Sequence, residues 1–448
     1  MTKTIAEITS AFASGLTTSA VETESALASI DATQGEGSRA FLKVYHDGAR
    51  ASARASDEAR TLGIQAGPLG GVTISVKDLF DVAGEVTLAG SKVRDESTVA
   101  LSDAPVLARL RAAGAVIVGR TNMTEFAFSG LGINPHYDTP RNPWDRATGR
   151  VPGGSSSGAA VSVADGMAVA AIGTDTGGSV RIPSALCGLT GFKPTARRVP
   201  TAGAFPLSTT LDSIGPLANS VACCALIDQV MSGEAVRPLI ARPVSGMTLA
   251  VPQTLFLDDM DDHVSAAFEH ALSRLSAAGA RIVEISFDVT ADILAANATG
   301  GFASPEAFAT LRDLLQADEG RFDPRVSVRV KRGGAMLAAD YLALLDDRVV
   351  IRAKANASSR EYDALLTPTT PIVAPAIADL VASDDAYHSA NMLMLRNPSF
   401  GNFLDRCATS LPIHRLGDAP VGLMVLGETL GDGKALEVAA GIEAALAT

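Results

Sequence analysis

Along the first sixty residues, hydrophobic side chains recur every three to four positions. The residues with this spacing are Ile5, Ile8, Phe12 and Leu16. A period close to 3.6 places such residues on one face of a helix. The sequence therefore predicts that residues 1–60 form helices that pack on the outside of the protein.

Beyond this region, hydrophobic residues come in short continuous runs that alternate with longer helical segments. The runs predict strands at 72–78, 115–119, 247–252, 281–285, 363–368 and 421–426. Helical spacing predicts helices at 103–111, 263–278 and 434–447 and a mostly helical segment at 300–358. Continuous apolar strands that alternate with helices are typical of α/β layering.

No internal repeat, low-complexity tract or linker divides the sequence. The simplest interpretation is one domain over residues 1–448, with helices on both faces of a sheet. Its predicted parts are N-terminal helices (1–60), a core (65–220), a variable segment (220–360) and a C-terminal return to the sheet (361–448). Loose attachment of the variable segment stays open as an alternative.

The charge balance argues against nucleic acid as a partner. The chain has 37 Lys and Arg against 49 Asp and Glu, a net charge of −12, and no basic cluster. No apolar segment approaches the roughly 20 residues of a membrane span, and the N-terminus lacks a signal-peptide core. The cysteines, which show no CxxC spacing, are Cys187, Cys223, Cys224 and Cys407. We therefore expect reduced, mostly buried thiols in a cytoplasmic protein without a membrane partner.

Motifs for metals and cofactors are also missing from the sequence. The six histidines show no HExxH or other paired metal spacing, so we expect no metal site. The stretch 431–435 resembles part of a phosphate-binding loop but lacks the upstream glycine and the final Ser or Thr. The sequence thus predicts a protein that works without a cofactor.

Two glycine-rich serine loops, at 153–158 and 174–179, are the strongest chemical signal. Glycine lets a backbone turn sharply so that its N–H groups converge, and a serine at such a point can perform acyl transfer. Gly154–Gly158 also fits the GxSxG pattern. That pattern requires a strand immediately before it, and the loop at 142–144 stands there instead. The nucleophile-elbow interpretation is therefore disfavoured.

Lys77 ends the predicted strand at 72–78 and offers an alternative base. An isolated lysine at a strand end more often reaches into solvent. If it is buried, desolvation lowers its pKa and allows it to accept a proton. A second serine could then carry the proton between the lysine and the nucleophile, and Ser155 and Ser179 supply the two serines.

These residues lie in blocks that resemble the amidase signature family. The three signature blocks are GVTISVKD (71–78), PGGSSSG (152–158) and GTDTGGSVRIPSALCGLTGFKPT (173–195). Further matches are GRTNMTEFA (119–127), NPWD (142–145), LDSIGPLA (211–218) and LTPTTP (366–371). The resemblance covers most of the chain and is densest over 65–220. It implies an α/β/α sandwich with a large mixed central sheet covered by helices on both faces, and hydrolysis of amides by a Ser–cis-Ser–Lys triad.

The resemblance also implies a role for each matched residue. Lys77 is similar to the family's lysine base, Ser155 to the serine that follows a cis peptide bond, and Ser179 to the acyl-enzyme nucleophile. The oxyanion hole would consist of the backbone N–H groups of Thr176, Gly177, Gly178 and Ser179.

We expect the neighbours of these residues to support the loops. Asp175 and Arg181 are expected to form loop-supporting hydrogen bonds rather than to perform chemistry, and Ser156 is expected to do the same. Further residues expected to be structural are Ser157, Cys187, His136 and His414, with pocket lining as an alternative for the two histidines.

The C-terminal block bears on the substrate. In the glutaminase subunit of the tRNA-dependent amidotransferase this block carries an acidic residue, whereas residues 393–404 here lack it and contain Arg396. Arg396 and Arg329 would suit a substrate that bears a carboxylate. We therefore expect a free-standing amidohydrolase that resembles the carboxybiuret-hydrolase and aminomuconate-deaminase type. The alternative is a glutaminase subunit that supplies ammonia to a partner. A homodimer or a small accessory subunit stays open.

Overall fold

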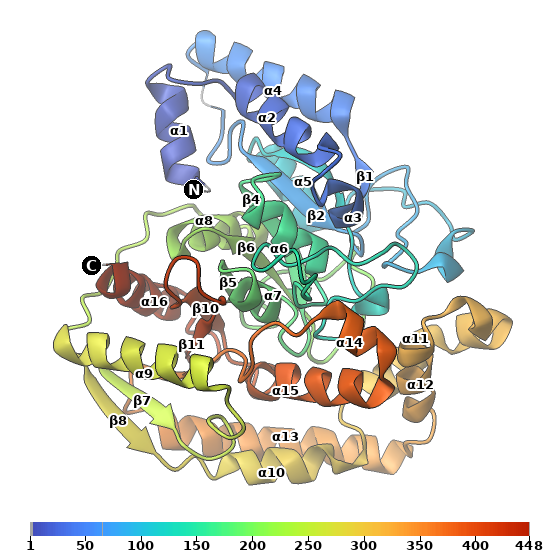
Figure 1. Cartoon of the computed structure of the whole chain (residues 1–448), viewed down its shortest axis with the longest axis vertical. Coiled ribbons are helices and arrows are strands. Elements are labelled where there is room, and N and C mark those ends of the chain that lie inside the picture. Colours follow the sequence, from blue (N-terminus) through green and yellow to red (C-terminus); the bar gives the residue numbers. More distant parts are fainter. Residues whose placement is uncertain (1–2, 65, 448) are drawn as a thin grey trace.

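The computed structural model describes residues 3–64 and 66–447. Within them, one mixed sheet of 11 strands runs through the molecule (Figure 1). The strand order is β1-β3-β2-β4-β6-β5-β10-β11-β9-β7-β8. The strands are β1 (Phe41–Val44), β2 (Thr73–Lys77), β3 (Val116–Thr121), β4 (Ala170–Asp175), β5 (Thr190–Lys193), β6 (Ser213–Ala218), β7 (Thr248–Pro252), β8 (Arg281–Ile285), β9 (Ala364–Pro368), β10 (Ala408–Pro412) and β11 (Gly422–Leu426).

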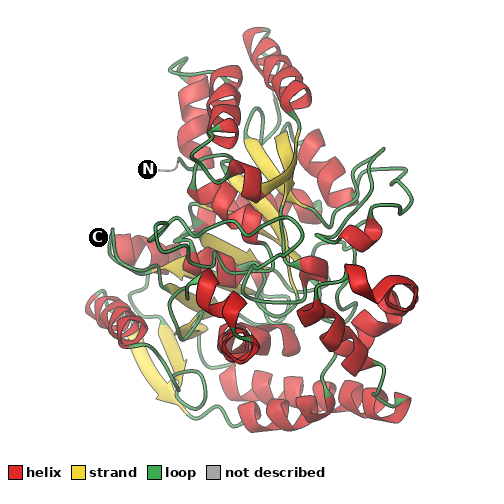
Figure 2. Cartoon of the chain, turned by 45° about the vertical axis from the view of Figure 1, so that its right-hand side comes forward, coloured by secondary structure: helices red, strands yellow, loops and turns green. Residues whose placement is uncertain are grey.

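Helices surround this sheet (Figure 2). They are α1 (Ile5–Ala13), α2 (Ser19–Asp31), α3 (Gly37–Ala40), α4 (His46–Thr61), α5 (Pro105–Ala112), α6 (Ser157–Ala164), α7 (Arg181–Leu186), α8 (Val221–Ser232), α9 (Asp262–Ala277), α10 (Val289–Ala296), α11 (Ala303–Asp318), α12 (Pro324–Gly333), α13 (Ala338–Ser359), α14 (Ile377–Ala382), α15 (Asp384–Phe403) and α16 (Asp432–Ala447). Short 3-10 helices lie at Lys92–Arg94, Glu125–Ala127, Asn297–Thr299 and Glu319–Arg321.

Local chemistry determines where several helices begin and end. Thr4 caps α1, and Glu7 reciprocates by accepting the Thr4 N–H at 2.7 Å, which completes a capping box. Pro105 occupies the first turn of α5, where its missing N–H costs nothing. Ser220 caps α8, and Gly233 ends it with a φ of 79° that favours glycine.

The two faces of the sheet are both covered, as the strand β2 illustrates. Ile74 and Val76 point into a hydrophobic core that also holds residues of α5, α8 and α16. Ser75 points to the other face, where its hydroxyl lies 2.8 Å from that of Ser162 on α6. The alternation of side chains along a strand thus places helices on both sides. The predicted α/β/α sandwich with a large mixed sheet is confirmed.

Several strand ends meet at one edge of the sheet, which we call the catalytic edge. The parallel strands β2 and β4 end there with Lys77 and Asp175. The antiparallel strand β6 begins there, with Ser213 opposite Asp175. Lys193 ends β5 opposite Ala408, which begins β10. Loops that join distant parts of the sequence are therefore brought together at this edge.

Every predicted strand is present, but the sheet contains more. The strands β1, β4, β5, β6 and β10 were not predicted, and β1 lies in the region 1–60 that was predicted to be helical. The strand β6 carries Pro216 opposite Ile172 of β4. The N-terminal helices are present, with Ile5 and Ile8 buried, whereas the prediction for Leu16 was wrong because it follows the end of α1 and is exposed.

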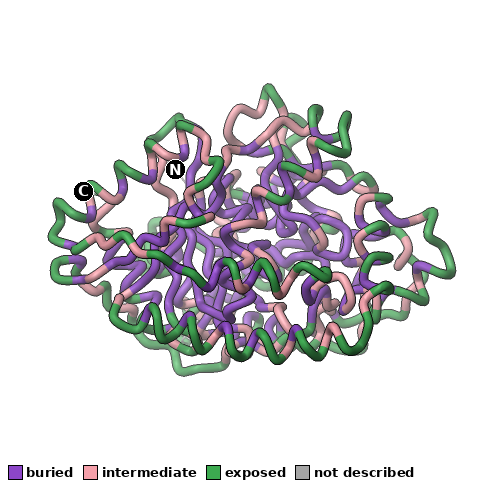
Figure 3. The backbone as a smooth tube through the Cα atoms, turned by 90° about the horizontal axis from the view of Figure 1, so that it is seen from below, coloured by how far each residue is buried: buried purple, intermediate pink, exposed green. Residues whose placement is uncertain are grey.

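All four predicted parts of the chain contribute strands to the sheet. The segment 220–360 supplies β7 and β8 at one margin, and 361–448 supplies β9, β10 and β11. This arrangement supports our proposal of one domain. Buried backbone occupies the interior and exposed backbone the rim (Figure 3). The four cysteines are buried and unpaired. Across residues 3–64 and 66–447 no helix is long and apolar enough to cross a membrane.

Candidate active site

Lys77 and Ser155 are in direct contact at the catalytic edge. The Lys77 Nζ lies 2.7 Å from the Ser155 Oγ and 3.0 Å from the Thr174 Oγ1. The peptide bond between Gly154 and Ser155 is cis. Both side chains are completely buried, so that Lys77 does not reach solvent.

Burial has a direct electrostatic consequence for Lys77. Desolvation of the ammonium lowers the pKa of Lys77 to about 7, although the Asp212 and Asp175 carboxylates act in the opposite direction. In the described part of the chain, no carboxylate lies within ion-pair distance of its Nζ. Near neutral pH, a large fraction of Lys77 is therefore uncharged and able to accept a proton.

Ser179 lies in the loop between β4 and α7 and is almost fully buried. Its carbonyl oxygen accepts the N–H of Ser156 at 3.3 Å, which ties the two glycine-rich serine loops together. Gly178 just before it has a φ of 126°, and an added Cβ would approach Ile182 and Pro398 to 2.6 Å. Glycine is required there for both reasons.

The backbone N–H groups of this loop do not all face the same way. The N–H of Gly178 donates to the Asp175 Oδ1 at 2.8 Å, so it is occupied within the protein. The N–H groups of Thr176, Gly177 and Ser179 make no hydrogen bond to another described residue. Of the four predicted oxyanion donors, these three remain available to a ligand.

Asp175 and Arg181 form a buried ion pair that holds this loop. Both side chains are 0% exposed, with the Arg181 Nη2 2.8 Å from the Asp175 Oδ1 and the Arg181 Nε 3.0 Å from its Oδ2. The Asn402 Nδ2 donates to the same carboxylate at 2.9 Å. Burial alone would raise the pKa of Asp175, but the Arg181 guanidinium holds it well below its usual range. These contacts fit a loop-supporting role.

The other predicted neighbours make structural contacts. The hydroxyls of Ser156 and Ser157 are buried and lie 3.5 Å and 3.4 Å from backbone carbonyls. Cys187 is buried, with its Sγ 3.3 Å from the Pro152 carbonyl oxygen. The His136 Nε2 lies 2.8 Å from the Glu125 Oε1.

Asp212 is a site residue that sequence analysis missed. Its Oδ1 accepts the Thr176 hydroxyl at 2.5 Å, and its Oδ2 accepts the N–H groups of Leu207 and Ser208 at 3.0 and 3.1 Å. Burial raises the pKa of Asp212 to about 6. The available signal was its position in the matched block LDSIGPLA. Asp212 thus braces the loop that carries the candidate oxyanion donors.

Arg329 lies beside the loop that borders the first serine loop. Its Nη1 donates to the Phe128 carbonyl oxygen at 2.5 Å, and its guanidinium lies 5.7 Å from the centre of the Tyr387 ring. Two residues along this loop, the Gly130 carbonyl accepts the Gly154 N–H at 2.7 Å. Arg329 is therefore close to the loop that positions Ser155.

Arg396 is held elsewhere. Its Nη2 donates to the carbonyl oxygens of Asp258 at 2.6 Å and Phe256 at 3.4 Å, in the loop that follows β7. Of the two arginines expected to meet a substrate carboxylate, only Arg329 contacts the loop that borders the first serine loop.

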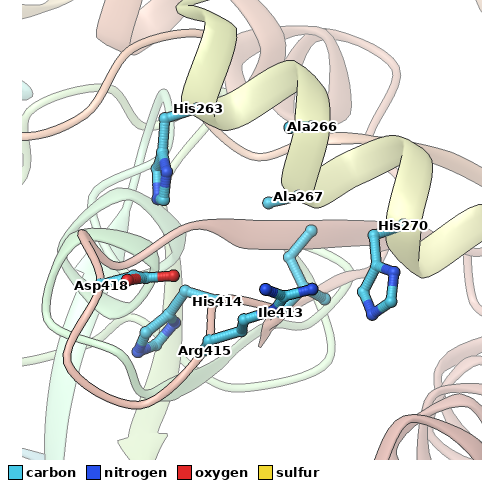
Figure 4. Close-up of a pocket in the computed structure, with 8 residues that line it drawn as sticks. All are labelled: His263, Ala266, Ala267, His270, Ile413, His414, Arg415 and Asp418. Carbon is cyan, nitrogen blue, oxygen red and sulfur yellow. The ribbon is translucent and has the colours of Figure 1, made fainter.

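A cavity of about 240 Å³ away from the candidate active site is lined by His414 (Figure 4). It lies between α9, which supplies His263 and His270, and the loop after β10, which also supplies Arg415. Because β10 begins at the catalytic edge, this loop follows the opposite end of the strand. The described residues contain no cluster of three or more His, Cys, Asp or Glu side chains that could hold a metal ion.

Comparison with known proteins gives consistent matches over nearly the whole chain. The sequence profile of the amidase family matches residues 23–436. The 2-amino-5-chloromuconic acid deaminase of Comamonas testosteroni is 38% identical, covering 89% of this chain and 87% of that protein. The AtzE subunit of the 1-carboxybiuret hydrolase of Pseudomonas sp. strain ADP is also 38% identical, over 83% of this chain and 82% of its own.

One further sequence relative and one solved structure also match this chain. A glutamyl-tRNA(Gln) amidotransferase subunit of Chloroflexus aggregans is 34% identical, over 97% of this chain and 94% of its own. A crystal structure of an amidase superimposes with a TM-score of 0.88 at 32% identity, covering 99% of both chains.

Proposed function

Since the chain belongs to the amidase family and is an enzyme that hydrolyses amide C–N bonds, we propose that it cleaves a small, carboxylate-bearing amide through an acyl-enzyme on Ser179. The contact that carries this proposal is the 2.7 Å approach of the buried Lys77 Nζ to the Ser155 Oγ. It joins a base of lowered pKa to a serine that can carry a proton.

The proposed reaction begins with neutral Lys77. It accepts the Ser155 hydroxyl proton while Ser155 takes the proton of Ser179, whose Oγ attacks the amide carbonyl carbon. The N–H groups of Thr176, Gly177 and Ser179 stabilise the oxyanion, and loss of one such donor typically costs about 3 kcal/mol. The relay returns the proton to the leaving ammonia or amine. Water then cleaves the ester by the same route.

The surroundings of Arg329 and the names of two relatives support the proposal that the substrate carries a carboxylate. Arg329 has no ion-pair partner in the described parts of the chain, although it is partly buried against the loop that borders the first serine loop. A guanidinium in this state suits a carboxylate. The names 2-amino-5-chloromuconic acid deaminase and 1-carboxybiuret hydrolase both denote acidic compounds.

The second candidate is a glutaminase subunit within an amidotransferase. The relatives described as subunits of glutamyl-tRNA(Gln) amidotransferase favour it. The missing acidic residue in 393–404 opposes it. We place the protein in the cytoplasm, which the four unpaired cysteines support. A homodimer and a small accessory subunit both stay open as partners.

Ammonia release by the purified chain tests the proposal. The substrates are glutamine, aliphatic and aryl amides, ureido acids and 2-aminomuconate-like acids, with Ser179→Ala as the test variant and the exposed Ser102→Ala as its control. Turnover of one acidic amide that disappears in Ser179→Ala and persists in Ser102→Ala is expected. Turnover of glutamine alone, or only with a second protein present, would favour the glutaminase interpretation. Survival of activity in Ser179→Ala would contradict the mechanism.

A further inference from the structure

A cavity of about 410 Å³ lies at the catalytic edge and shares Asp212 with the candidate active site. One wall is the segment after β5, with Arg197 and Thr201, and another is the segment before β6, with Thr210 and Asp212. Arg348 on α13 contributes the remaining charged wall. The volume suits a small molecule.

Arg348 is a buried cation without a partner anion. The residue is 8% exposed, and in the described chain no carboxylate lies within ion-pair distance of its guanidinium. The Nε donates to the Phe403 carbonyl at 2.7 Å and the Nη2 to the Asn402 carbonyl at 3.1 Å. The Nη1 makes no hydrogen bond to a described residue. Because desolvation lowers the pKa of Arg348 only to about 10, the guanidinium stays charged. An unpaired buried charge is costly.

The acidic groups near the cavity are already satisfied by other donors. Both oxygens of Asp212 accept hydrogen bonds from Thr176 and from backbone N–H groups. The Glu306 Oε2 accepts the Thr210 N–H at 3.0 Å, and its Oε1 accepts the Tyr341 hydroxyl at 2.7 Å. Neither acid is engaged with Arg348, so that the guanidinium remains available to a ligand.

We infer that this cavity binds a small carboxylate, with Arg348 as the charged partner and the Thr201 and Thr210 hydroxyls as further hydrogen-bonding groups. Arg197, which is exposed and pairs with Asp405, stands at the opening. A carboxylate and a guanidinium form strong charge-assisted hydrogen bonds, and a ligand would supply the anion that Arg348 lacks.

The cavity also contacts the catalytic loop. Asp212 lines the cavity and accepts the hydroxyl of Thr176, one of the candidate oxyanion residues. The carboxylate is therefore either an acidic group of the amide substrate or a separate ligand that acts on the loop. The first alternative rests on the proposed function, and the second does not.

Calorimetric titration of the full chain with malonate tests the site. We expect the Kd to rise at least tenfold in Arg348→Met, which corresponds to about 1.4 kcal/mol. Lys354→Met is the matched control because this exposed cation lies on the same helix and pairs with Asp292; its Kd should equal that of the wild type. Thr210→Val removes one cavity hydroxyl and serves if Arg348→Met does not fold, with an expected rise of about threefold.

Three results would overturn the inference. They are no malonate binding to the folded wild type, equal affinity in wild type and folded Arg348→Met, and loss of binding in Arg329→Met with retention in Arg348→Met. The last result would assign the anion to Arg329. If Arg348→Met does not fold, an unchanged Kd in Thr210→Val overturns it as well.

Steady-state kinetics then distinguish the two sources of the carboxylate. If the carboxylate belongs to the substrate, malonate competes with the acidic amide. Arg348→Met then raises the KM of the acidic amide but not the KM of a neutral analogue. If it is a separate ligand, malonate changes kcat without competing. Both outcomes support the site. Malonate binding that needs Arg348 in a chain without hydrolase activity would refute the proposed function alone.

Discussion

Two buried arginines that share a neighbour have opposite surroundings. Arg181 is 0% exposed and forms two hydrogen bonds with the Asp175 carboxylate. Arg348 is 8% exposed, donates to two backbone carbonyls and lies over the Phe302 ring, without an ion pair to a described carboxylate. Asn402 contacts both, because its Oδ1 accepts from Arg181 and its carbonyl oxygen from Arg348. One cation is neutralised within the fold, and the other is not.

The difference separates structural charges from charges that are kept for a ligand or a reaction. Lys77 belongs with Arg348, since it is fully buried and contacts two hydroxyls but no carboxylate. Burial of an unpaired cation lowers stability. Such a residue lowers the stability of the fold but has a use in function. Lys77 is proposed to accept a proton in its neutral form, and Arg348 is proposed to bind an anion.

The largest expected effect follows from breaking the paired charge. Arg181→Met leaves the buried Asp175 carboxylate without its cation, and the free energy of unfolding should fall by about 3–5 kcal/mol. Urea denaturation followed by circular dichroism measures this loss. The double variant Asp175→Asn/Arg181→Met should lose less than Arg181→Met, because no buried charge remains. A loss below about 1 kcal/mol in Arg181→Met would contradict a structural role for the pair.

The sequence singled out the two serine loops as the candidate site because their signal is local. Within each loop the glycines and serines stand next to one another in the chain, and the Ser156–Ser179 contact then joins the two loops. Lys77 needed only the additional expectation of a buried strand. Residues far apart in the sequence can also line one cavity, as Asp212 and Arg348 do. Such a contact leaves no local pattern in the sequence.

Prolines account for two of the elements that the sequence did not reveal, β6 and α15. Pro216 lies within β6, between β4 and β5, although proline normally indicates an edge strand or a loop. Pro398 lies within α15 and interrupts its helical pattern. Without α15, the different surroundings of Arg396 and Arg329 could not be recognised, and both were expected to meet the substrate.

The pH dependence of catalysis tests whether Lys77, with its lowered pKa, is the base. Because the base must be neutral and its pKa is lowered to about 7, kcat/KM should fall tenfold per pH unit below 7, or about 100-fold at pH 5. Asp212→Asn should move this limb to lower pH, since the Asp212 carboxylate raises the pKa of Lys77. A profile that is flat from pH 5 to 8 would exclude Lys77 as the base.

Replacing Lys77 should raise the free energy of unfolding, whereas replacing Arg181 should lower it. Lys77→Met removes an unpaired buried cation, and the free energy of unfolding should rise by about 1–4 kcal/mol at pH 6 while activity is lost. Between pH 7 and the unfolded pKa near 10.5, the unfolded wild type binds the extra proton, so wild-type stability rises with pH. The advantage of Lys77→Met should therefore shrink at pH 9. An advantage that grows with pH would contradict the lowered pKa.

Arg348→Met is expected to have the smallest effect on stability. The carbonyls of Phe403 and Asn402 lose their donors, which costs about 1–2 kcal/mol, but removal of an unpaired buried charge offsets part of this cost. The net change in the free energy of unfolding should stay within about 1 kcal/mol, well below that of Arg181→Met. Malonate at 100 times the wild-type Kd should stabilise the wild type by about 2.7 kcal/mol, and Arg348→Met, with its Kd at least tenfold higher, by at most about 1.4 kcal/mol. A loss as large as that of Arg181→Met would show that Arg348 is a structural charge as well, and the distinction between the two arginines would fail.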